Sequence, residues 1–189
     1  MKKDVDFNIY EKLAHKYGMS LNQAKANCRN MEELARESGL EFNLDTLILT
    51  NTFDAHRLTL FAKTKGLMKE TAERILRAYY TESKHIGDYP TLIQLGEEVG
   101  LNPQEVEKML ASQEMAEQVR ADEQDAEHYG IRSIPFYLIN KKYAITGAQP
   151  VEIFVKTLLQ IMEDDGPFSS EASQAGNSCD DDGCSIPEK

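Results

Sequence analysis

The sequence predicts an α/β fold that is mostly helical, with one β-hairpin and a helix after it. Two short apolar segments, Phe136–Ile139 and Tyr143–Thr146, are separated by three polar residues, which is the pattern of paired strands. Residues 7–129 instead repeat apolar side chains every three or four positions, as amphipathic helices do. Residues 151–162 follow the same helical pattern, so a helix is expected to close the fold.

Residues that favour turns bound the hairpin. The polar segment Asn140-Lys141-Lys142 joins the two strands, and Gly147 ends the second. Pro135 heads the first strand, where a missing N–H does least harm. Because the first strand is apolar throughout, it is predicted to be buried on both faces. A two-stranded hairpin is marginally stable alone, so we expect the sheet to be completed by a segment outside these residues or by a second copy of the chain.

Composition limits the class of partner. The 189 residues fit one domain in length, and a hydrophobic content of 41% is enough for a substantial core. The formal net charge of −11 at pH 7 argues against nucleic acids and anionic membranes, because phosphate groups require a basic face. There is no signal-peptide pattern and no apolar stretch long enough to cross a bilayer. A soluble, cytoplasmic protein is therefore expected.

Cysteine and histidine usage does not predict a metal site. Of the three cysteines, Cys28 stands alone, and Cys179 and Cys184 are separated by four residues. This spacing differs from that of a secreted disulfide scaffold. The four histidines are scattered, with no pair at metal-ligand spacing. Neither a metal nor a cofactor is predicted.

Residues 7–39 predict two helices. Asp6 is the expected N-cap of the first, and Gly18 is its expected C-terminal stop. Ser20 and Gln23 form a capping-box pattern for the second helix, which should end at Gly39. The apolar face of this second helix is formed by Leu21, Ala24, Cys28, Met31 and Ala35. A thiol on such a face behaves as a small hydrophobe, so Cys28 is expected to be structural.

The next segment contains two candidate site residues. Residues 47–50 are a short apolar run that predicts either an extended connector or an edge strand. Asn51 or Thr52 can cap the helix that follows. His56 and Arg57 occupy the first turn and a half of that helix. From the residues alone, His56 is equally consistent with a packed or solvated surface side chain and with a functional one.

The remaining chain contains clear signals for the starts of three helices. Asp88 is expected to begin one helix, and Asn102-Pro103 with Glu105 supplies an N-cap, an N1 proline and an acidic first turn for the next. The helix that opens after Gln149-Pro150 is expected to cover one face of the hairpin. From residue 163 onward apolar residues are scarce, so the tail is predicted to be disordered.

Two segments, in this order, resemble a known family. Residues 130–137, Gly-Ile-Arg-Ser-Ile-Pro-Phe-Tyr, followed by Asn-Lys-Lys-Tyr-Ala-Ile-Thr-Gly-Ala-Gln-Pro at 140–150, are similar to the second half of the DsbA-like branch of the thioredoxin fold. Asn-Thr-Phe-Asp-Ala-His-Arg at 51–57 is similar to a segment of its FrnE-like group. The resemblance implies a thioredoxin-like α/β fold, organised as a helical insertion-type region at 1–130, the C-terminal hairpin and helix of the thioredoxin-like domain at 131–163, and an acidic tail at 164–189.

The resemblance also implies a site. Pro135 would be the cis-proline beside the active-site thiols, and the backbone at Ile134 would hydrogen-bond extended substrate. His56 and Arg57 would lie at a helix start that faces the same groove. Family members begin with a strand, a Cys-x-x-Cys helix and a second strand, which this sequence does not contain. We therefore expect a truncated polypeptide whose main catalytic residues are unknown.

The tail contains a candidate accessory redox pair, Cys179 and Cys184. Gly183 can supply the turn that brings the two thiols together. The intervening aspartates disfavour a thiolate, and the simplest interpretation is a reduced, idle pair. Some members of the FrnE-like group have a second Cys-x4-Cys pair near the C-terminus, which implies electron exchange with a main Cys-x-x-Cys.

The leading hypothesis is a DsbA-like thiol-disulfide oxidoreductase that acts on protein or small-molecule thiols and disulfides. The chain by itself is expected to be weakly active or inactive. A glutathione-dependent isomerase of the same superfamily is one alternative. A non-enzymatic module that holds extended peptide around Ile134 and Pro135 is another. A homodimer is an open alternative for the assembly, and neither nucleic acid nor membrane is expected as a partner.

Overall fold

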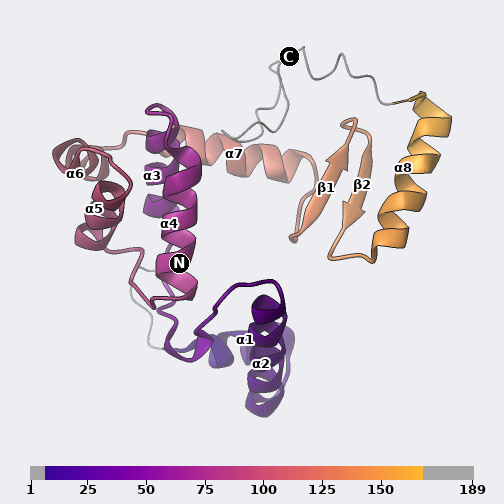
Figure 1. Ribbon diagram of the computed structural model, residues 1–189, viewed down its shortest axis with the longest axis horizontal. Helices are drawn as coiled ribbons and strands as arrows, with labels where there is room; N and C mark the ends of the chain where they lie inside the picture. Colours follow the sequence, from indigo (N-terminus) through magenta and orange to yellow (C-terminus); the bar gives the residue numbers. More distant parts are fainter. Residues whose placement is uncertain (1–6, 168–189) are drawn as a thin grey trace. The chain divides into compact units, whose positions relative to one another are not determined.

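The computed structural model describes residues 7–167, which form eight α-helices and two β-strands (Figure 1). Asp6, Cys179, Cys184 and the part of the tail from residue 168 lie outside the described residues. The predicted disorder from residue 163 onward is wrong for residues 163–165, because the last helix, α8 (Val151–Asp165), continues to Asp165. The chain divides into two compact units, Met1–Val119 and Arg120–Lys189. We call them the helical unit and the hairpin unit and describe each by itself. No helix in the described part of the chain is long and apolar enough to span a membrane.

The described part of the helical unit is built from six complete helices of 9 to 17 residues and the start of a seventh. The six are α1 (Ile9–Tyr17), α2 (Leu21–Glu37), α3 (Phe53–Lys63), α4 (Met68–Tyr80), α5 (Tyr89–Glu98) and α6 (Pro103–Ala111), with a 3-10 turn at Leu44–Thr46. Helix α7 (Ala116–His128) begins in this unit and ends in the hairpin unit.

The first two helices begin at side-chain caps. The predicted N-cap of α1, Asp6, is wrong, because the side chain of Asn8 accepts a hydrogen bond from the backbone N–H of Glu11 and the helix begins two residues later than expected. The predicted capping box of Ser20 and Gln23 is confirmed. Gly18 ends α1 in the left-handed region, at φ 63°, which glycine adopts at no steric cost.

One edge of α2 is buried. Cys28 packs in a cluster with Leu44, Leu47 and Leu49, and Ala24 and Ala35 are buried on the same helix. Leu21 and Met31, predicted for this face, are 50% and 52% exposed. The prediction of one continuous apolar face is wrong at these two positions, because the cluster against α2 is narrower than the apolar stripe of the helix.

Residues 47–50 form an extended connector and are not part of a strand. Of the two predicted alternatives, the extended connector is confirmed and the edge strand is wrong. Leu47, Leu49 and Thr50 are buried in the connector, at 9%, 5% and 2% exposure. This segment leads directly into α3, and its burial fixes where that helix begins.

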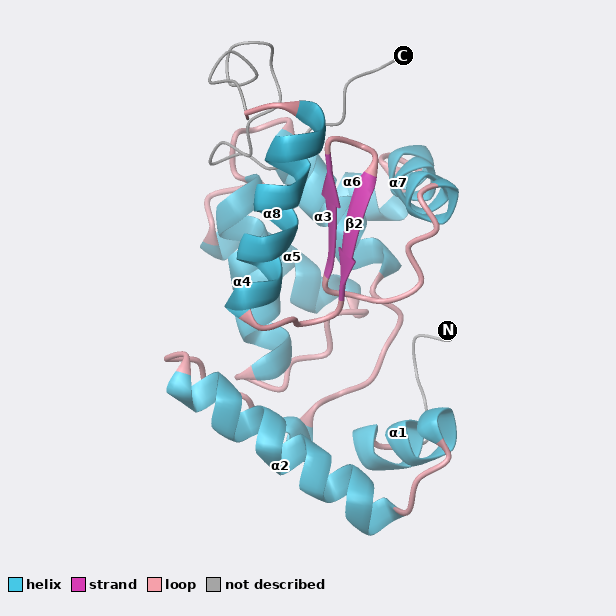
Figure 2. Cartoon of the chain, turned by 90° about the vertical axis from the view of Figure 1, so that its right-hand side faces the viewer, coloured by secondary structure: helices cyan, strands magenta, loops and turns pink. Residues whose placement is uncertain are grey.

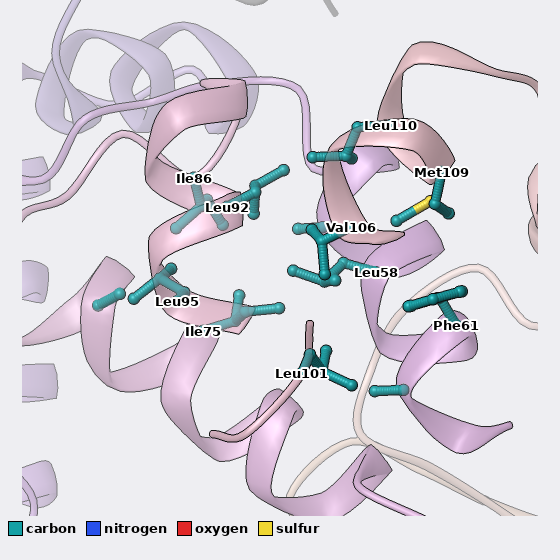
Figure 3. Packing of buried hydrophobic residues seen from close by; sticks show 13 residues of the cluster. Leu58, Phe61, Ile75, Ile86, Leu92, Leu95, Leu101, Val106, Met109 and Leu110 are labelled. Carbon is teal, nitrogen blue, oxygen red and sulfur yellow. The ribbon is translucent and has the colours of Figure 1, made fainter. Parts of the chain in front are cut away.

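The main core lies among α3 to α6 (Figure 3). The predicted inner residues Leu58, Phe61 and Ala62 of α3 are buried there. They pack with buried side chains of the other helices and of the loops between them: Ile75, Ala78, Ile86, Leu92, Leu95, Leu101, Val106, Met109 and Leu110. The expected helix starts at Asp88 and Asn102 are confirmed, since both side chains accept hydrogen bonds from backbone N–H groups of the following turn.

The hairpin unit contains β1 (Phe136–Ile139) and β2 (Tyr143–Thr146), which pair antiparallel as predicted. Phe136 lies opposite Thr146, and Ile139 lies opposite Tyr143. The turn residues Asn140 and Lys141 have φ of 52° and 55°. A turn with two consecutive residues of positive φ matches the right-handed twist of the paired strands. The segment 140–142 therefore joins β1 and β2 directly.

Helix α8 (Val151–Asp165) lies along one face of the hairpin in both ribbon views (Figures 1 and 2). Tyr137 of β1 meets Phe154 of α8 edge to face, with ring centroids 4.8 Å apart. Ile145 and Ile161 are buried in this layer. The end of α8 is tied to the hairpin by Asp165, which accepts a hydrogen bond from Lys142 at 2.8 Å.

The prediction that the first strand is buried on both faces is wrong in the described structure. Tyr137 and Leu138 are 43% and 36% exposed. In the part of the chain that the structure describes, β1 has one neighbouring strand. The apolar run therefore has fewer neighbours than its composition predicts.

Candidate substrate-binding loop

The loop between α7 and β1 presents an exposed apolar residue at the head of a strand. Ile134 is 88% exposed, and the Ile134–Pro135 peptide bond is cis. The carbonyl of Pro135 accepts a hydrogen bond of 2.8 Å from the N–H of Gly147. This bond extends the β1–β2 pairing by one step and holds the loop against the end of β2.

The backbone of Ile134 is available for pairing. Neither its N–H nor its C=O has a hydrogen-bond partner among residues 7–167. Backbone groups in such a position can pair with an extended peptide. The loop can therefore hold an extended chain by its backbone, while the Pro135 carbonyl keeps its internal partner.

His56 lies on the exposed side of α3, whereas Arg57 is 3% exposed. The guanidinium of Arg57 contacts the carboxylate of Asp54 at 2.8 Å. Its remaining contacts are with backbone carbonyls at the end of α6 and just beyond, at 2.7 to 3.5 Å, namely those of Met109, Leu110, Ser112 and Glu114.

Five acceptors thus surround a group that has five N–H donors. Two of the carbonyls, those of Met109 and Leu110, belong to the last turn of α6, which leaves its carbonyls without partners inside the helix. The Met109 carbonyl also accepts from Ser112. Asp54 balances the buried positive charge. The predicted contact of Arg57 with substrate would require these bonds to be released, and it stays a prediction. In the sequence, the Asp-x-x-Arg spacing was the signal that could have predicted the Asp54–Arg57 pair. No sequence signal pointed to the carbonyl partners.

The predicted site residues fall in two places. Ile134 and Pro135 adjoin in the hairpin unit, and His56 and Arg57 adjoin in the helical unit.

Cys28 is a poor candidate for a nucleophile. It is 3% exposed, and burial raises the pKa of its thiol, with the carboxylates of Glu32 and Asp45 adding to the effect. The hydroxyl of Tyr10 donates a hydrogen bond to the carboxylate of Asp45. Burial and this hydrogen bond hold the pKa of Tyr10 well above its ordinary value. Because the thiolate is the reactive form, this environment keeps the Cys28 thiol protonated.

The chain has a helical region followed by an antiparallel hairpin that is headed by an X–Pro bond and covered by a helix, and the comparisons with known proteins identify its fold as thioredoxin-like, of the DsbA type. The DSBA-like thioredoxin domain matches residues 3–159, so the chain belongs to this family of thiol-disulfide oxidoreductases. The crystal structure of a probable DsbA oxidoreductase from Streptomyces coelicolor is similar, with 31% sequence identity and a TM-score of 0.75. The similarity covers 96% of this chain and 77% of that one. No curated protein matches the chain.

Proposed function

We propose that the chain is a DsbA-like thiol-disulfide oxidoreductase of the FrnE-like branch, in which the Ile134–Pro135 loop holds extended substrate. The observation that carries this proposal is the exposed, unpaired backbone of Ile134 at the head of β1. Family membership supplies the chemistry, and the loop supplies a place where a cysteine-bearing peptide can lie.

The reaction is an exchange of sulfur–sulfur bonds. A thiolate attacks one sulfur of a substrate disulfide, a mixed disulfide forms, and the other substrate sulfur leaves and takes up a proton. A second enzyme thiol then displaces the substrate as its second thiol. Two electrons and two protons pass from the dithiol to the substrate disulfide. Ile134 contributes by position, since it fixes the peptide while the sulfurs align.

The cysteines of the sequence limit which thiols can take part. The sequence has no Cys-x-x-Cys, and Cys179 and Cys184 are its one close pair. We assign them an accessory role in which they exchange electrons with a main redox pair. Three aspartates lie between them, and negative neighbours disfavour thiolate formation. The chain alone should therefore react slowly.

The test is insulin reduction by dithiothreitol, catalysed by the chain and by cysteine variants at equal concentration. We expect a rate only slightly above that of dithiothreitol alone. This small excess should disappear in Cys179→Ser/Cys184→Ser and stay unchanged in Cys28→Ser. Joining a strand, a Cys-x-x-Cys helix and a strand from the family to the chain should raise the rate by orders of magnitude. Fast turnover by the chain itself, unchanged in the double variant, would overturn the assignment.

A second candidate function is supported by the same loop. The exposed backbone of Ile134 can hold a peptide without any redox step, as a binding module does. Equal binding of a cysteine-containing peptide and its serine analogue, with no mixed disulfide formed by the joined chain described above, would favour this function over the oxidoreductase.

A further inference from the structure

A cleft lies in the helical unit between residues 39–42, which follow α2, and the exposed side of α4. Its volume is about 500 Å³, within the range of roughly 300–1,000 Å³ found for small-ligand sites. The proposed oxidoreductase function uses none of its residues.

Hydrogen bonds hold the two walls of the cleft together. The Thr81 hydroxyl donates to the carbonyl of Glu41 at 2.6 Å, and the Asn43 side chain donates to the carbonyl of Thr81 at 2.6 Å. The backbone N–H of Asn43 donates to the carbonyl of Tyr80 at 2.7 Å. The loop is thus fixed to the end of α4, and a ligand would not need to order it, which lowers the cost of binding.

The cleft has apolar walls. Phe42 and Tyr80 stack with ring centroids 4.6 Å apart and an interplanar angle of 22°. Leu40 and Leu76, which line the cleft, are each 52% exposed. Covering this surface with an apolar side chain would be favourable, at about 25 cal/mol per Å² of apolar area.

The charge of the cleft selects a cation. Glu41 and Glu73 line it, and neither carboxylate has an ion-pair partner among the described residues. The guanidinium of Arg77, also in the lining, lies 3.4 Å from Glu82. Glu82 lies outside the lining and also pairs with Arg74 and Lys84. The lining therefore carries two carboxylates and one guanidinium, which leaves it negative overall. The faces of aromatic rings attract a cation as well.

Charge also disfavours two occupants from the same chain. Residues 179–184 carry three aspartates and no basic residue, so the carboxylates would repel them. A second copy would bring a net charge of −11 to a partner of the same charge. We propose that the cleft binds a peptide segment of another protein, with an apolar side chain against Phe42 and Tyr80 and an adjacent Lys or Arg near Glu41 and Glu73.

The test is a titration of the ¹⁵N-labelled chain with the peptide Ac-Gly-Phe-Lys-Gly-NH₂, in which NMR measures the amide chemical shifts of the chain. We expect the shifts to change at residues 39–43 and 73–81. The peptide Ac-Gly-Phe-Glu-Gly-NH₂ should bind more weakly. Glu73→Gln should raise the Kd of the lysine peptide about twofold to fivefold, as expected for an exposed ion pair. Leu76→Ser should raise the Kd by a similar or larger factor.

Glu107→Gln is the matched control, because it removes the same charge from an exposed position on α6 outside the cleft. It should leave the Kd unchanged. Equal binding of the two peptides, or wild-type affinity in Glu73→Gln, would overturn the proposal. Shifts confined to residues 133–136 would also overturn it, and would report binding at the loop of the proposed oxidoreductase instead. Failure of the redox assay leaves this outcome unaffected, since the titration involves no thiol.

Discussion

The helical unit and the hairpin unit bury their apolar residues to different extents. In the helical unit, four helices enclose side chains such as Leu58, Leu92 and Val106, all with 0% exposure. In the described part of the hairpin unit, Ile145 and Ile161 are the buried hydrophobics, and α8 leaves Val151 and Leu159 more than half exposed. Similar apolar patterns in sequence thus give an enclosed core where four helices meet, and a partly exposed layer where one helix packs on a two-stranded hairpin.

The largest expected effect is at the buried ion pair of the helical unit. Arg57→Leu should lower the free energy of unfolding by about 3–5 kcal/mol, because it removes a buried guanidinium that pairs with Asp54 and binds four backbone carbonyls. Urea denaturation followed by circular dichroism measures the change. The variant Asp54→Asn/Arg57→Leu should lose less than Arg57→Leu alone. An equal loss would show that the carbonyl contacts, and not the charge pair, dominate.

The core comparison is tested directly by a matched pair of leucines. Leu92→Ala, in the core of the helical unit, should lower the free energy of unfolding by about 2–5 kcal/mol. Leu159→Ala, on α8 with 56% exposure, should change it by less than about 0.5 kcal/mol. Both changes replace leucine by alanine within a helix, so helix propensity is similar. Similar losses in the two variants would contradict the difference between the units.

A smaller effect is expected where Gly87 approaches the connector. A Cβ at this position would overlap Thr50 Oγ1. Gly87→Ala should therefore cost about 1–3 kcal/mol, the usual range for overpacking. Thermal and urea denaturation of Gly87→Ala, Thr50→Ala and the double variant give the coupling. The double variant should lose less than the sum of the two single changes; strict additivity would exclude the contact.

The smallest effect is a pH dependence in the ion-pair network of α4. Arg74 donates to Glu98 at 2.5 Å and to Glu82 at 2.8 Å, and these bonds lower the pKa of both carboxyl groups. Because the folded-state pKa lies below the unfolded one, the stabilisation is present above the unfolded pKa, near 4.3, and is lost as pH falls through the folded pKa.

Arg74→Gln should therefore be less stable than the wild type at pH 7, by about 1 kcal/mol or less since the carboxylates are partly exposed, and the difference should disappear near pH 2. Lys142→Gln is the comparison in the hairpin unit, where a hydrogen bond from Lys142 lowers the pKa of Asp165. A stability difference for Arg74→Gln that grows as pH falls would contradict the assignment.

Local signals predicted much of this fold. The capping box at Ser20 and Gln23, the starts at Asp88 and Asn102, and the hairpin turn at 140–142 depend on neighbours in sequence. The position of the Ile134–Pro135 loop followed from its motif. In each case the physical cause lies within a few residues.

What could not be predicted depends on distant partners. Leu21 and Met31 have apolar spacing, but their burial is decided by what packs on α2. Arg57 belongs to a recognisable segment, but its carbonyl acceptors lie more than 50 residues away in sequence. The exposure of β1 likewise depends on the number of neighbouring strands, which its own composition does not encode.

The Arg57 contacts have a consequence for local opening of the chain. They join the start of α3 to carbonyls separated from it by 52 to 57 positions. When the end of α6 unravels, the guanidinium loses most of its acceptors, and the start of α3 loses the support that it gives. Amide hydrogens in these two segments should consequently exchange with solvent in one cooperative step of similar free energy, while those of α1, outside this core, exchange through smaller openings.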